Sequence, residues 1–356
     1  MFFSKKFLLT ALSAALLVSP SVVPAAEYVD VLDMPAAMSQ LAIKNPLNAV
    51  THAGDRLVTV GIRGHILYSD DTGKTWQQAK VPVSSDLTSV YFPTASDGWA
   101  VGHDGVVLHS SDGGQSWSKQ LDGTQTGKIM LDHYTALAAT DPANEQYATL
   151  VADAQRVADE GADKPFLDVW FADNQNGYVV GAFGMIFRTS DAGKSWVPLN
   201  EMVDNAQGYH LNAISGSGAD VMLVSEMGLV LRLDPATGKF TSVQTPFDGT
   251  YFGLLHTGNG IVIYGLRGMA FSTADGGNSW RKLDVPVGKA LTAATQDKDG
   301  ELFLFDQAGE VLSSKDGASF QLHPQTSASP ISGAAAVGSE ALVLVGPRGV
   351  RVFPIE

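Results

Sequence analysis

Three arginines stand at the same position of a repeated four-residue turn and could together bind an anion. The turn has the form Gly-x-x-Gly, and Arg63, Arg267 and Arg348 occupy its third position. A guanidinium group offers several N–H donors in a planar fork, so a cluster of them suits a carboxylate, a phosphate or an acidic peptide segment. Two interpretations stay open: the arginines bind such a partner, or they are solvated or paired with nearby acids such as Asp306 and Glu310.

The corresponding turns of other repeats add candidates for the same binding surface. They carry His103 and Asp104 in one repeat, Phe183 in the next and Met227 in another. Turns on a rigid scaffold are common sites of recognition. We therefore predict that these four residues bind a partner together with the three arginines.

The other residue types that could carry chemistry lack the spacing for it. The eight histidines contain no pair at metal-ligand spacing, and the chain has no cysteine. His52, His210 and His256 fall in or near expected inner strands, where they would be core residues or would line a channel. The sequence therefore predicts no catalytic residue, no metal site and no cofactor.

These candidates are positioned by a repeated unit that covers most of the chain. Its closing aromatic residue recurs about every 40 residues, a period typical of propeller blades. Four copies are well preserved: Val60–Trp76, Val101–Trp117, Val180–Trp196 and Tyr264–Trp280. Three weaker copies complete a set of seven: Val224–Phe240, Phe305–Phe320 and Val345–Phe353.

Each unit predicts a four-stranded antiparallel sheet whose last hairpin reads Ser/Thr-x-Asp-x-Gly-x-Ser/Thr-Trp. In this motif, called the Asp-box or BNR repeat, short polar side chains bond their own turn, glycine takes a positive φ, and tryptophan begins the outer strand. We expect a structural role for it, and we expect blades four and six to have lost it. The structural residues are Ser69, Asp71, Gly73, Trp76, Ser110, Asp112, Gly114, Trp117, Asp191, Gly193, Trp196, Asp275, Gly277 and Trp280.

The chain as a whole is predicted to be an all-β, seven-bladed β-propeller. The N-terminal stretch Glu27–Met34 is expected to add a strand to blade seven and so close the ring, because an unjoined propeller leaves exposed sheet edges. The blades are expected at 45–82, 86–121, 165–200, 209–245, 250–286, 289–324 and 329–356.

An insertion at about 124–164 separates blades two and three. Its apolar spacing predicts a helical hairpin, with a first helix at Ile129–Ala139 and a second that Asp141 caps and that ends near Gly161. Because the insertion follows an outer strand, it should emerge on the face that carries the Gly-x-x-Gly turns. The Asp-boxes should lie on the opposite face.

Composition and charge exclude some classes of partner. The chain has 356 residues, of which 45% are hydrophobic, and a formal charge of −14, which disfavours nucleic acid at long range. Residues 1–26 have the pattern of a secretory signal, which predicts export of a single domain over 27–356. No later segment is long and apolar enough to span a membrane. We expect a monomer that binds a protein.

The unit pattern resembles the photosynthesis system II stability and assembly factor family over essentially the whole mature chain, including the lead-ins Phe92–Gly102 and Phe171–Gly181. The resemblance implies a non-enzymatic propeller on the lumenal or periplasmic side that binds a membrane-protein partner through an arginine-bearing surface. It also implies an alternative setting beside RND-type exporters in non-photosynthetic bacteria. The competing interpretation is a sialidase-like Asp-box glycoside hydrolase, although the Arg-Ile-Pro motif of sialidases does not occur.

Overall fold

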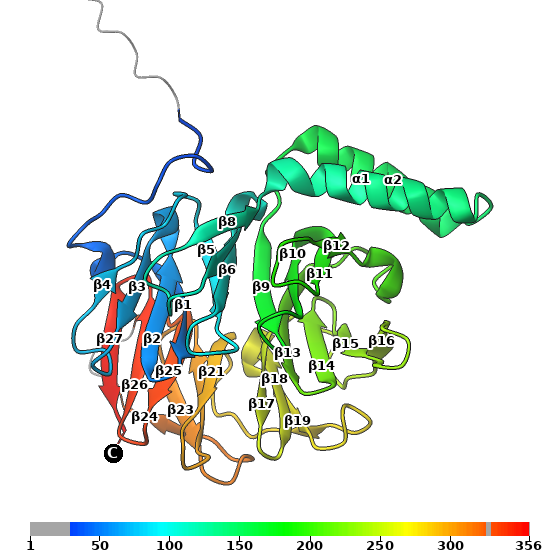
Figure 1. The fold of residues 1–356 in the computed structure, drawn as a ribbon. Coiled ribbons are helices and arrows are strands. Elements are labelled where there is room, and N and C mark those ends of the chain that lie inside the picture. Colours follow the sequence, from blue (N-terminus) through cyan, green and yellow to red (C-terminus); the bar gives the residue numbers. More distant parts are fainter. Residues whose placement is uncertain (1–28, 325–328, 356) are drawn as a thin grey trace, which may run out of the picture.

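The computed structural model describes residues 29–324 and 329–355, which form a ring of seven antiparallel sheets (Figure 1). Six sheets have four strands and one has three, and in each sheet the strands lie in chain order. The first strands of neighbouring sheets contact one another around the whole ring, including the first sheet with the last. The predicted seven-bladed propeller is therefore confirmed.

The first four blades have the following strands. Blade one contains β1 (Leu47–Ala53), β2 (Arg56–Gly61), β3 (Ile66–Ser69) and β4 (Gln77–Gln78). Blade two contains β5 (Leu87–Tyr91), β6 (Gly98–Gly102), β7 (Val107–Ser110) and β8 (Ser118–Leu121). Blade three contains β9 (Phe166–Phe171), β10 (Gly177–Gly181), β11 (Ile186–Thr189) and β12 (Val197–Pro198). Blade four contains β13 (Leu211–Ser217), β14 (Asp220–Ser225), β15 (Val230–Leu233) and β16 (Phe240–Val243).

The remaining blades and the helices complete the fold. Blade five contains β17 (Tyr251–Thr257), β18 (Gly260–Gly265), β19 (Ala270–Thr273) and β20 (Arg281–Lys282). Blade six contains β21 (Leu291–Gln296), β22 (Leu302–Asp306), β23 (Val311–Ser314) and β24 (Gln321–His323), and blade seven contains β25 (Gly333–Val337), β26 (Ala341–Gly346) and β27 (Gly349–Pro354). The helices are α1 (Gly123–Thr140) and α2 (Glu145–Glu160), with short 3₁₀ turns η1 (Ala42–Lys44), η2 (Ile62–Gly64), η3 (His103–Gly105), η4 (Ala182–Gly184), η5 (Asn200–Met202) and η6 (Leu266–Gly268).

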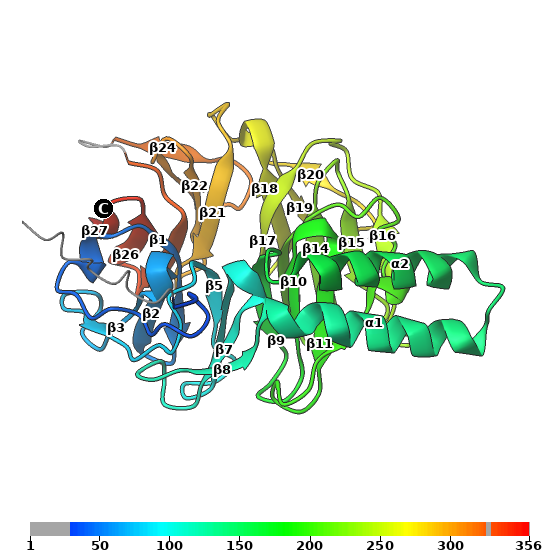
Figure 2. The ribbon, with the colours of Figure 1, turned by 90° about the horizontal axis from the view of Figure 1, so that it is seen from above.

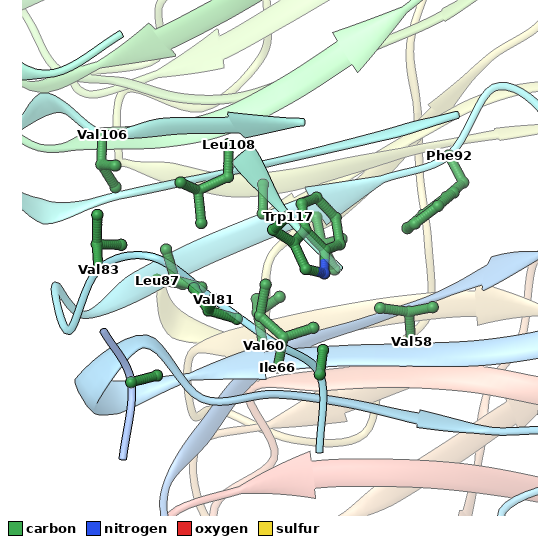
Figure 3. Packing of buried hydrophobic residues seen from close by; sticks show 14 of the residues in the cluster. Val58, Val60, Ile66, Val81, Val83, Leu87, Phe92, Val106, Leu108 and Trp117 are labelled. Atoms are coloured by element: carbon green, nitrogen blue, oxygen red, sulfur yellow. The ribbon is translucent and has the colours of Figure 1, made fainter. Parts of the chain in front are cut away.

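The core lies between the blades. The second strand of each blade is an almost continuous buried run, because a neighbouring sheet covers each of its faces. Between blades one and two, Val58 and Val60 face Leu108 and Trp117 (Figure 3). The Trp117 ring meets the edge of Phe92 with ring centres 5.8 Å apart. The outer tryptophan of blade two thus packs against blade one.

The Asp-boxes are closed networks of hydrogen bonds within one turn. Ser69 Oγ donates to Asp71 Oδ1 (2.8 Å), and Asp71 accepts from the backbone N–H and the hydroxyl of Thr75 (2.8 and 2.6 Å). Hydrogen bonds from Thr75 lower the pKa of Asp71 to about 2. Gly73 takes φ 83°, and its carbonyl accepts from the Trp76 indole (3.0 Å). The same hydroxyl and carboxylate contacts recur at Asp112, Asp191 and Asp275.

Blade six keeps its Asp-box turn, so the expectation that blade six had lost the motif is wrong. Ser314 Oγ donates to Asp316 (2.8 Å), which also accepts from the backbone N–H groups of Ala318 and Ser319. Phe320 replaces the tryptophan and stands one position nearer to the aspartate. The turn therefore survives without the aromatic residue that made the other copies easy to recognise.

The insertion forms the predicted helical hairpin, but its helices begin at other residues than expected. Asp122 caps α1 by accepting a hydrogen bond from the Thr124 N–H, so the helix starts well before Ile129. Asn144, and not Asp141, caps α2 by accepting from the first backbone N–H groups of that helix. Both caps have the side-chain oxygen that free helical N–H groups require.

The sequence does not indicate where α1 starts, because its first residues disfavour a helix. The same residues allow close packing. A Cβ atom on Gly127 would lie 2.4 Å from the Cα atom of Ala158 in α2. Glycine has poor helix propensity, so the pattern of Gly123–Lys128 does not indicate a helix by itself. The two helices lie side by side and project beyond the edge of the ring (Figures 1 and 2).

The N-terminal stretch does not complete blade seven, so this prediction is wrong for residues 29–34; Glu27 and Tyr28 lie outside the described residues. Asp30 forms a local turn, because its carboxylate accepts from the Leu32 N–H (2.9 Å) and bends the chain. Leu32 is buried in the cluster between blades one and two, and its carbonyl accepts from Lys119 Nζ (2.9 Å).

Side-chain packing closes the ring instead. Leu57 of blade one and Val343 of blade seven share one apolar cluster, and Leu47 and Val345 share another. His52 Nε2 also lies 2.9 Å from the carbonyl oxygen of Ala336 in blade seven. Within the described residues, blade seven thus has three strands and joins blade one through its buried faces.

Candidate functional site

The turns between the second and third strands place one residue of each of five blades in the same unusual backbone conformation; four of these turns read Gly-x-x-Gly, and the turn of blade four begins with Ser225. Arg63, Asp104, Phe183, Met227 and Arg267 all have φ between 53° and 60°. This left-handed region is disfavoured for residues with a side chain. The turns need this conformation because the second strand must pass directly into the third. The glycine that follows each of these residues has positive φ as well.

Blade seven makes its turn differently. Gly346 pairs with Gly349, so only Pro347 and Arg348 lie in the loop. The positive φ (79°) falls on Gly349, and Arg348 is not strained. Arg348 is still exposed at the same end of its blade as Arg63 and Arg267 are in theirs.

The three arginines, which we call the arginine arc, are exposed and unpaired. Across residues 29–324 and 329–355, no side-chain hydrogen bond or ion pair involves Arg63, Arg267 or Arg348. The structure does not show the alternative in which Asp306 and Glu310 of blade six pair with these arginines. Glu310 faces Lys289 (3.4 Å), and one carboxylate oxygen of Asp306 accepts backbone N–H groups of its own turn.

The other predicted binding residues lie in the same ring of turns, in blades two, three and four. Phe183 and Met227 are exposed to 54% and 62% in blades three and four. In blade two, His103 is exposed, while Asp104 is half-buried beside the base of the hairpin. The arc spans blades five, seven and one, so the face has a basic side and an apolar side.

The hairpin belongs to this face, as the sequence predicts. Its base packs on the turn of blade two, where a Cβ atom on Gly105 would lie 2.8 Å from Gly123. The Lys164 ammonium lies 5.6 Å from the centre of the Phe183 ring in the turn of blade three. Contacts at both turns fix the hairpin beside the apolar side of the face.

The connection between blades three and four anchors the hairpin further. The buried Tyr134 hydroxyl of α1 donates to Asn200 Oδ1 (2.9 Å) and accepts from the Asn200 N–H (3.0 Å). His133 Nε2 lies 3.3 Å from Glu201 Oε1. Sequence reasoning did not single out Asn200 or Glu201, because they belong to no repeat and no motif.

Polar groups near the start of the inner strands link successive blades around the channel. The donors are side chains of one blade and the acceptors are carbonyls of the next: Asn48 to Leu87, Thr88 to Phe166, Asn212 to Tyr251, and Thr292 to Ile331. The cavity at the centre of the ring, about 240 Å³, is lined by inner-strand residues of all seven blades. His52, His210 and His256 do not line it.

Asp168 is the one carboxylate among the residues that line this cavity. It accepts hydrogen bonds from Ser89 Oγ of blade two (2.6 Å) and from the Ile214 N–H of blade four (2.8 Å). Burial raises the pKa of Asp168 to about 6. Because it joins three blades, Asp168 has a structural function in the channel.

Two features are absent from residues 29–324 and 329–355. No helix there is long and apolar enough to cross a membrane. No three histidine, cysteine, aspartate or glutamate side chains come together in a way that could hold a metal ion.

Comparison with known proteins identifies the repeat. The family model for the photosynthesis system II assembly factor YCF48 matches residues 38–144 and 148–281. The chain is 26% identical over 271 residues to the chloroplastic photosystem II stability/assembly factor HCF136 of Oryza sativa subsp. japonica; the match covers 74% of this chain and half of the rice protein. It is 23% identical to the photosystem II assembly lipoprotein Ycf48 of Synechococcus sp. strain CC9902, over 77% of this chain and 73% of that protein.

Solved structures agree on the fold. The chain superposes on YCF48 bound to a D1 peptide with a TM-score of 0.64 and 19% identity, over 92% of this chain and 99% of that one. It superposes on YCF48 from Cyanidioschyzon merolae with a TM-score of 0.63 and 15% identity, over 90% and 98% of the two chains. The family model covers well over half of the residues, and the chain therefore belongs to the photosynthesis system II assembly factor YCF48 family.

Proposed function

We propose that this chain is an exported, non-catalytic assembly scaffold that binds an extramembrane segment of a membrane protein. Residues 1–26 would direct export and then be removed, which leaves the propeller on the periplasmic or lumenal side. The partner would lie across the turn face and bring an acidic residue or a free carboxylate to the arginine arc. The scaffold would act as a monomer, without a cofactor and without binding nucleic acid.

The observation that carries this proposal is that the arginine arc is exposed and has no acidic partner among the described residues. Three guanidinium groups are exposed at one end of the ring and have no acidic partner among the described residues, although the chain has 37 acidic side chains. Three exposed guanidinium groups at one end of an acidic protein create a local positive potential, which favours an anionic ligand there. A rigid, turn-based display suits recognition of a short peptide segment.

Membership of the family supports the kind of partner. One relative with the same fold has been solved with a D1 peptide, and the curated relatives are named as photosystem II assembly factors. The partner of this chain is either a photosystem protein or, in a non-photosynthetic organism, a component of an RND-type exporter. Identification of the bound protein decides between these two settings.

The glycoside hydrolase alternative is less well supported. Glycosidases of this kind need two carboxyl groups that flank the bond to be broken. The four intact Asp-boxes use their carboxylates inside their own turns, and the cavity at the ring centre is lined by a single carboxylate, Asp168. A screen for glycosidase turnover tests this alternative directly.

The central test compares two triple variants of the tagged protein in native membranes. In the first, Arg63, Arg267 and Arg348 are changed to Glu. In the second, which makes the same change in charge away from the arc, Arg156, Arg188 and Arg281 are changed to Glu. We expect the first variant alone to lose its membrane partner, as measured by quantitative mass spectrometry of the recovered complexes. Equal recovery with both variants would remove the arc from the proposal.

A second measurement asks whether the interaction is direct. The partner segment is mapped by cross-linking, synthesised and titrated against the purified propeller at increasing salt. Binding through exposed arginines should weaken as ionic strength rises, because salt screens exposed charges. Affinity that does not change with salt would mean that the arc is not the binding site.

A further inference from the structure

A hollow beside the hairpin lies on the apolar side of the turn face. It is a cleft of about 660 Å³ between α2 and the connection from blade three to blade four. Leu150 and Asp153 of α2 form one wall, and Phe183, Glu201 and Asp204 contribute to the other. The volume is in the range of sites that take a small ligand or a few side chains.

The charges that line the cleft are mainly negative. Three carboxylates, those of Asp153, Glu201 and Asp204, line the cleft with one ammonium group, that of Lys239, and Asp153 is paired with Arg156 at 3.2 Å. Lys239 is already paired with Asp204 at 2.8 Å. Glu201 is therefore the one of these three carboxylates without a lysine or arginine partner among the described residues, and the acidic lining of the cleft contrasts with the arginine arc on the other side of the same face.

Glu201 is the carboxylate that lacks a full set of partners. Its side chain is only 13% exposed, and Oε1 lies 3.3 Å from His133 Nε2. Its Oε2 is buried and has no hydrogen-bond partner among the described residues. A buried carboxylate oxygen without a donor is costly, so a donor supplied by a bound group would be favourable.

Apolar groups stand beside this carboxylate. Leu150 lies on the hairpin wall, and Phe183 exposes 54% of its surface in a turn whose backbone is held at φ 56°. A long side chain with methylene groups and a cationic end matches this arrangement, because its stem contacts apolar surface while its end donates to the acid.

We propose that the hairpin cleft binds a basic side chain, arginine or lysine, of the same partner segment whose acidic group binds the arc. This inference rests on the proposed function for the identity of the segment, but the cleft itself can be tested alone. Two sites of opposite charge on one face would also fix the direction in which the segment lies. A segment with its acidic and basic residues exchanged would place like charges together.

The test uses the mature, full-length propeller and isothermal titration calorimetry with two peptides. The first is acetylated, amidated Ala-Leu-Arg-Leu-Ala, and the second has citrulline, a neutral isostere, in place of the arginine. Three proteins are compared with the wild type: Glu201→Gln in the cleft, Asp132→Asn as the control, and the triple arc variant. Asp132 is exposed on the same hairpin and does not line the cleft, so its substitution makes the same change in charge elsewhere.

We expect the arginine peptide to bind the wild type, Asp132→Asn and the arc variant alike, and Glu201→Gln at least about tenfold more weakly, as for loss of a charged hydrogen bond. The citrulline peptide should lose affinity to a similar extent. Equal affinity for the two peptides, or equal losses in Glu201→Gln and Asp132→Asn, would overturn the proposal. The arc variant should keep its affinity for the arginine peptide but lose its affinity for the acidic segment. The experiment therefore distinguishes failure of the cleft proposal from failure of the arc proposal. Thermal melting of each variant checks that it is folded.

Discussion

The two faces of the propeller use the same repeat in opposite ways. On the Asp-box face, the hydroxyl and carboxylate side chains of each box bond within their own turn, as Ser69, Asp71 and Thr75 do. On the turn face, the backbone repeats from blade to blade while the side chains differ and Arg63 and Arg267 stay unpaired. The repeat thus builds the fold where its hydroxyl and carboxylate groups bond within their own turn, and the proposed recognition lies where five blades share a backbone conformation but differ in side chain.

The largest expected difference between the faces concerns stability. Trp117→Ala should reduce the free energy of unfolding by about 3–5 kcal/mol, because the ring is 7% exposed and fills the space between blades one and two. Phe183→Ala on the other face should change it by less than about 0.5 kcal/mol, since that ring is mostly exposed. Urea denaturation followed by circular dichroism measures both. Similar losses in the two variants would contradict the division into a structural and a recognition face.

The next largest change in the free energy of unfolding is expected from the N-terminal stretch. Its position distinguishes packing between blades one and two from an added strand in blade seven. Leu32→Ala should cost about 2–3 kcal/mol, because Leu32 is buried at the seam of blades one and two. Met38→Ala should cost little, as Met38 is 66% exposed. Hydrogen exchange should show the added opening in blades one and two. Opening confined to blade seven would instead support the prediction that this stretch adds a strand to blade seven.

These residues also show why some features could be predicted from sequence and others could not. The Asp-boxes and the Gly-x-x-Gly turns were predictable because each depends on residues close in the chain, and together they determine the number of blades. The position of Leu32 depends on a nonlocal apolar site, and the local turn at Asp30 competes with the strand that alternation suggests. Glu201 gains its significance only from the hairpin packed above it, so no local pattern could single it out.

Acid should affect the channel and the boxes in opposite directions. The folded pKa of Asp168, about 6, lies above the usual value of 3.8, so its contribution to stability is full below about pH 4 and is lost as pH rises through 6. The folded pKa of Asp71, about 2, lies below the usual value, so its contribution is present above pH 4 and is lost as pH falls toward 2.

Asp168→Asn should therefore remove a pH dependence on the order of 2 kcal/mol between pH 4 and 7, as judged from urea midpoints across this range. Asp71→Asn is the matched substitution on the Asp-box face and should leave that part of the profile unchanged. A wild-type slope between pH 4 and 7 that persists in Asp168→Asn would show that another group is responsible.

The smallest expected change in stability comes from the residue that should matter most for binding. Arg63 has φ 57°, a conformation that glycine adopts without strain, so Arg63→Gly should alter the free energy of unfolding by less than about 0.5 kcal/mol. The same substitution should weaken binding of the acidic partner segment. Gly64→Ala, one residue along the same turn, is the contrasting variant. Its new Cβ would lie 2.2 Å from the carbonyl oxygen of Val83 at φ 69°, so it should unfold more easily. Titration of the mapped partner segment and urea denaturation of both variants separate the two roles. If Arg63→Gly binds as the wild type does, the unpaired arginine is only a solvated turn residue, and the difference between the faces would not extend to function.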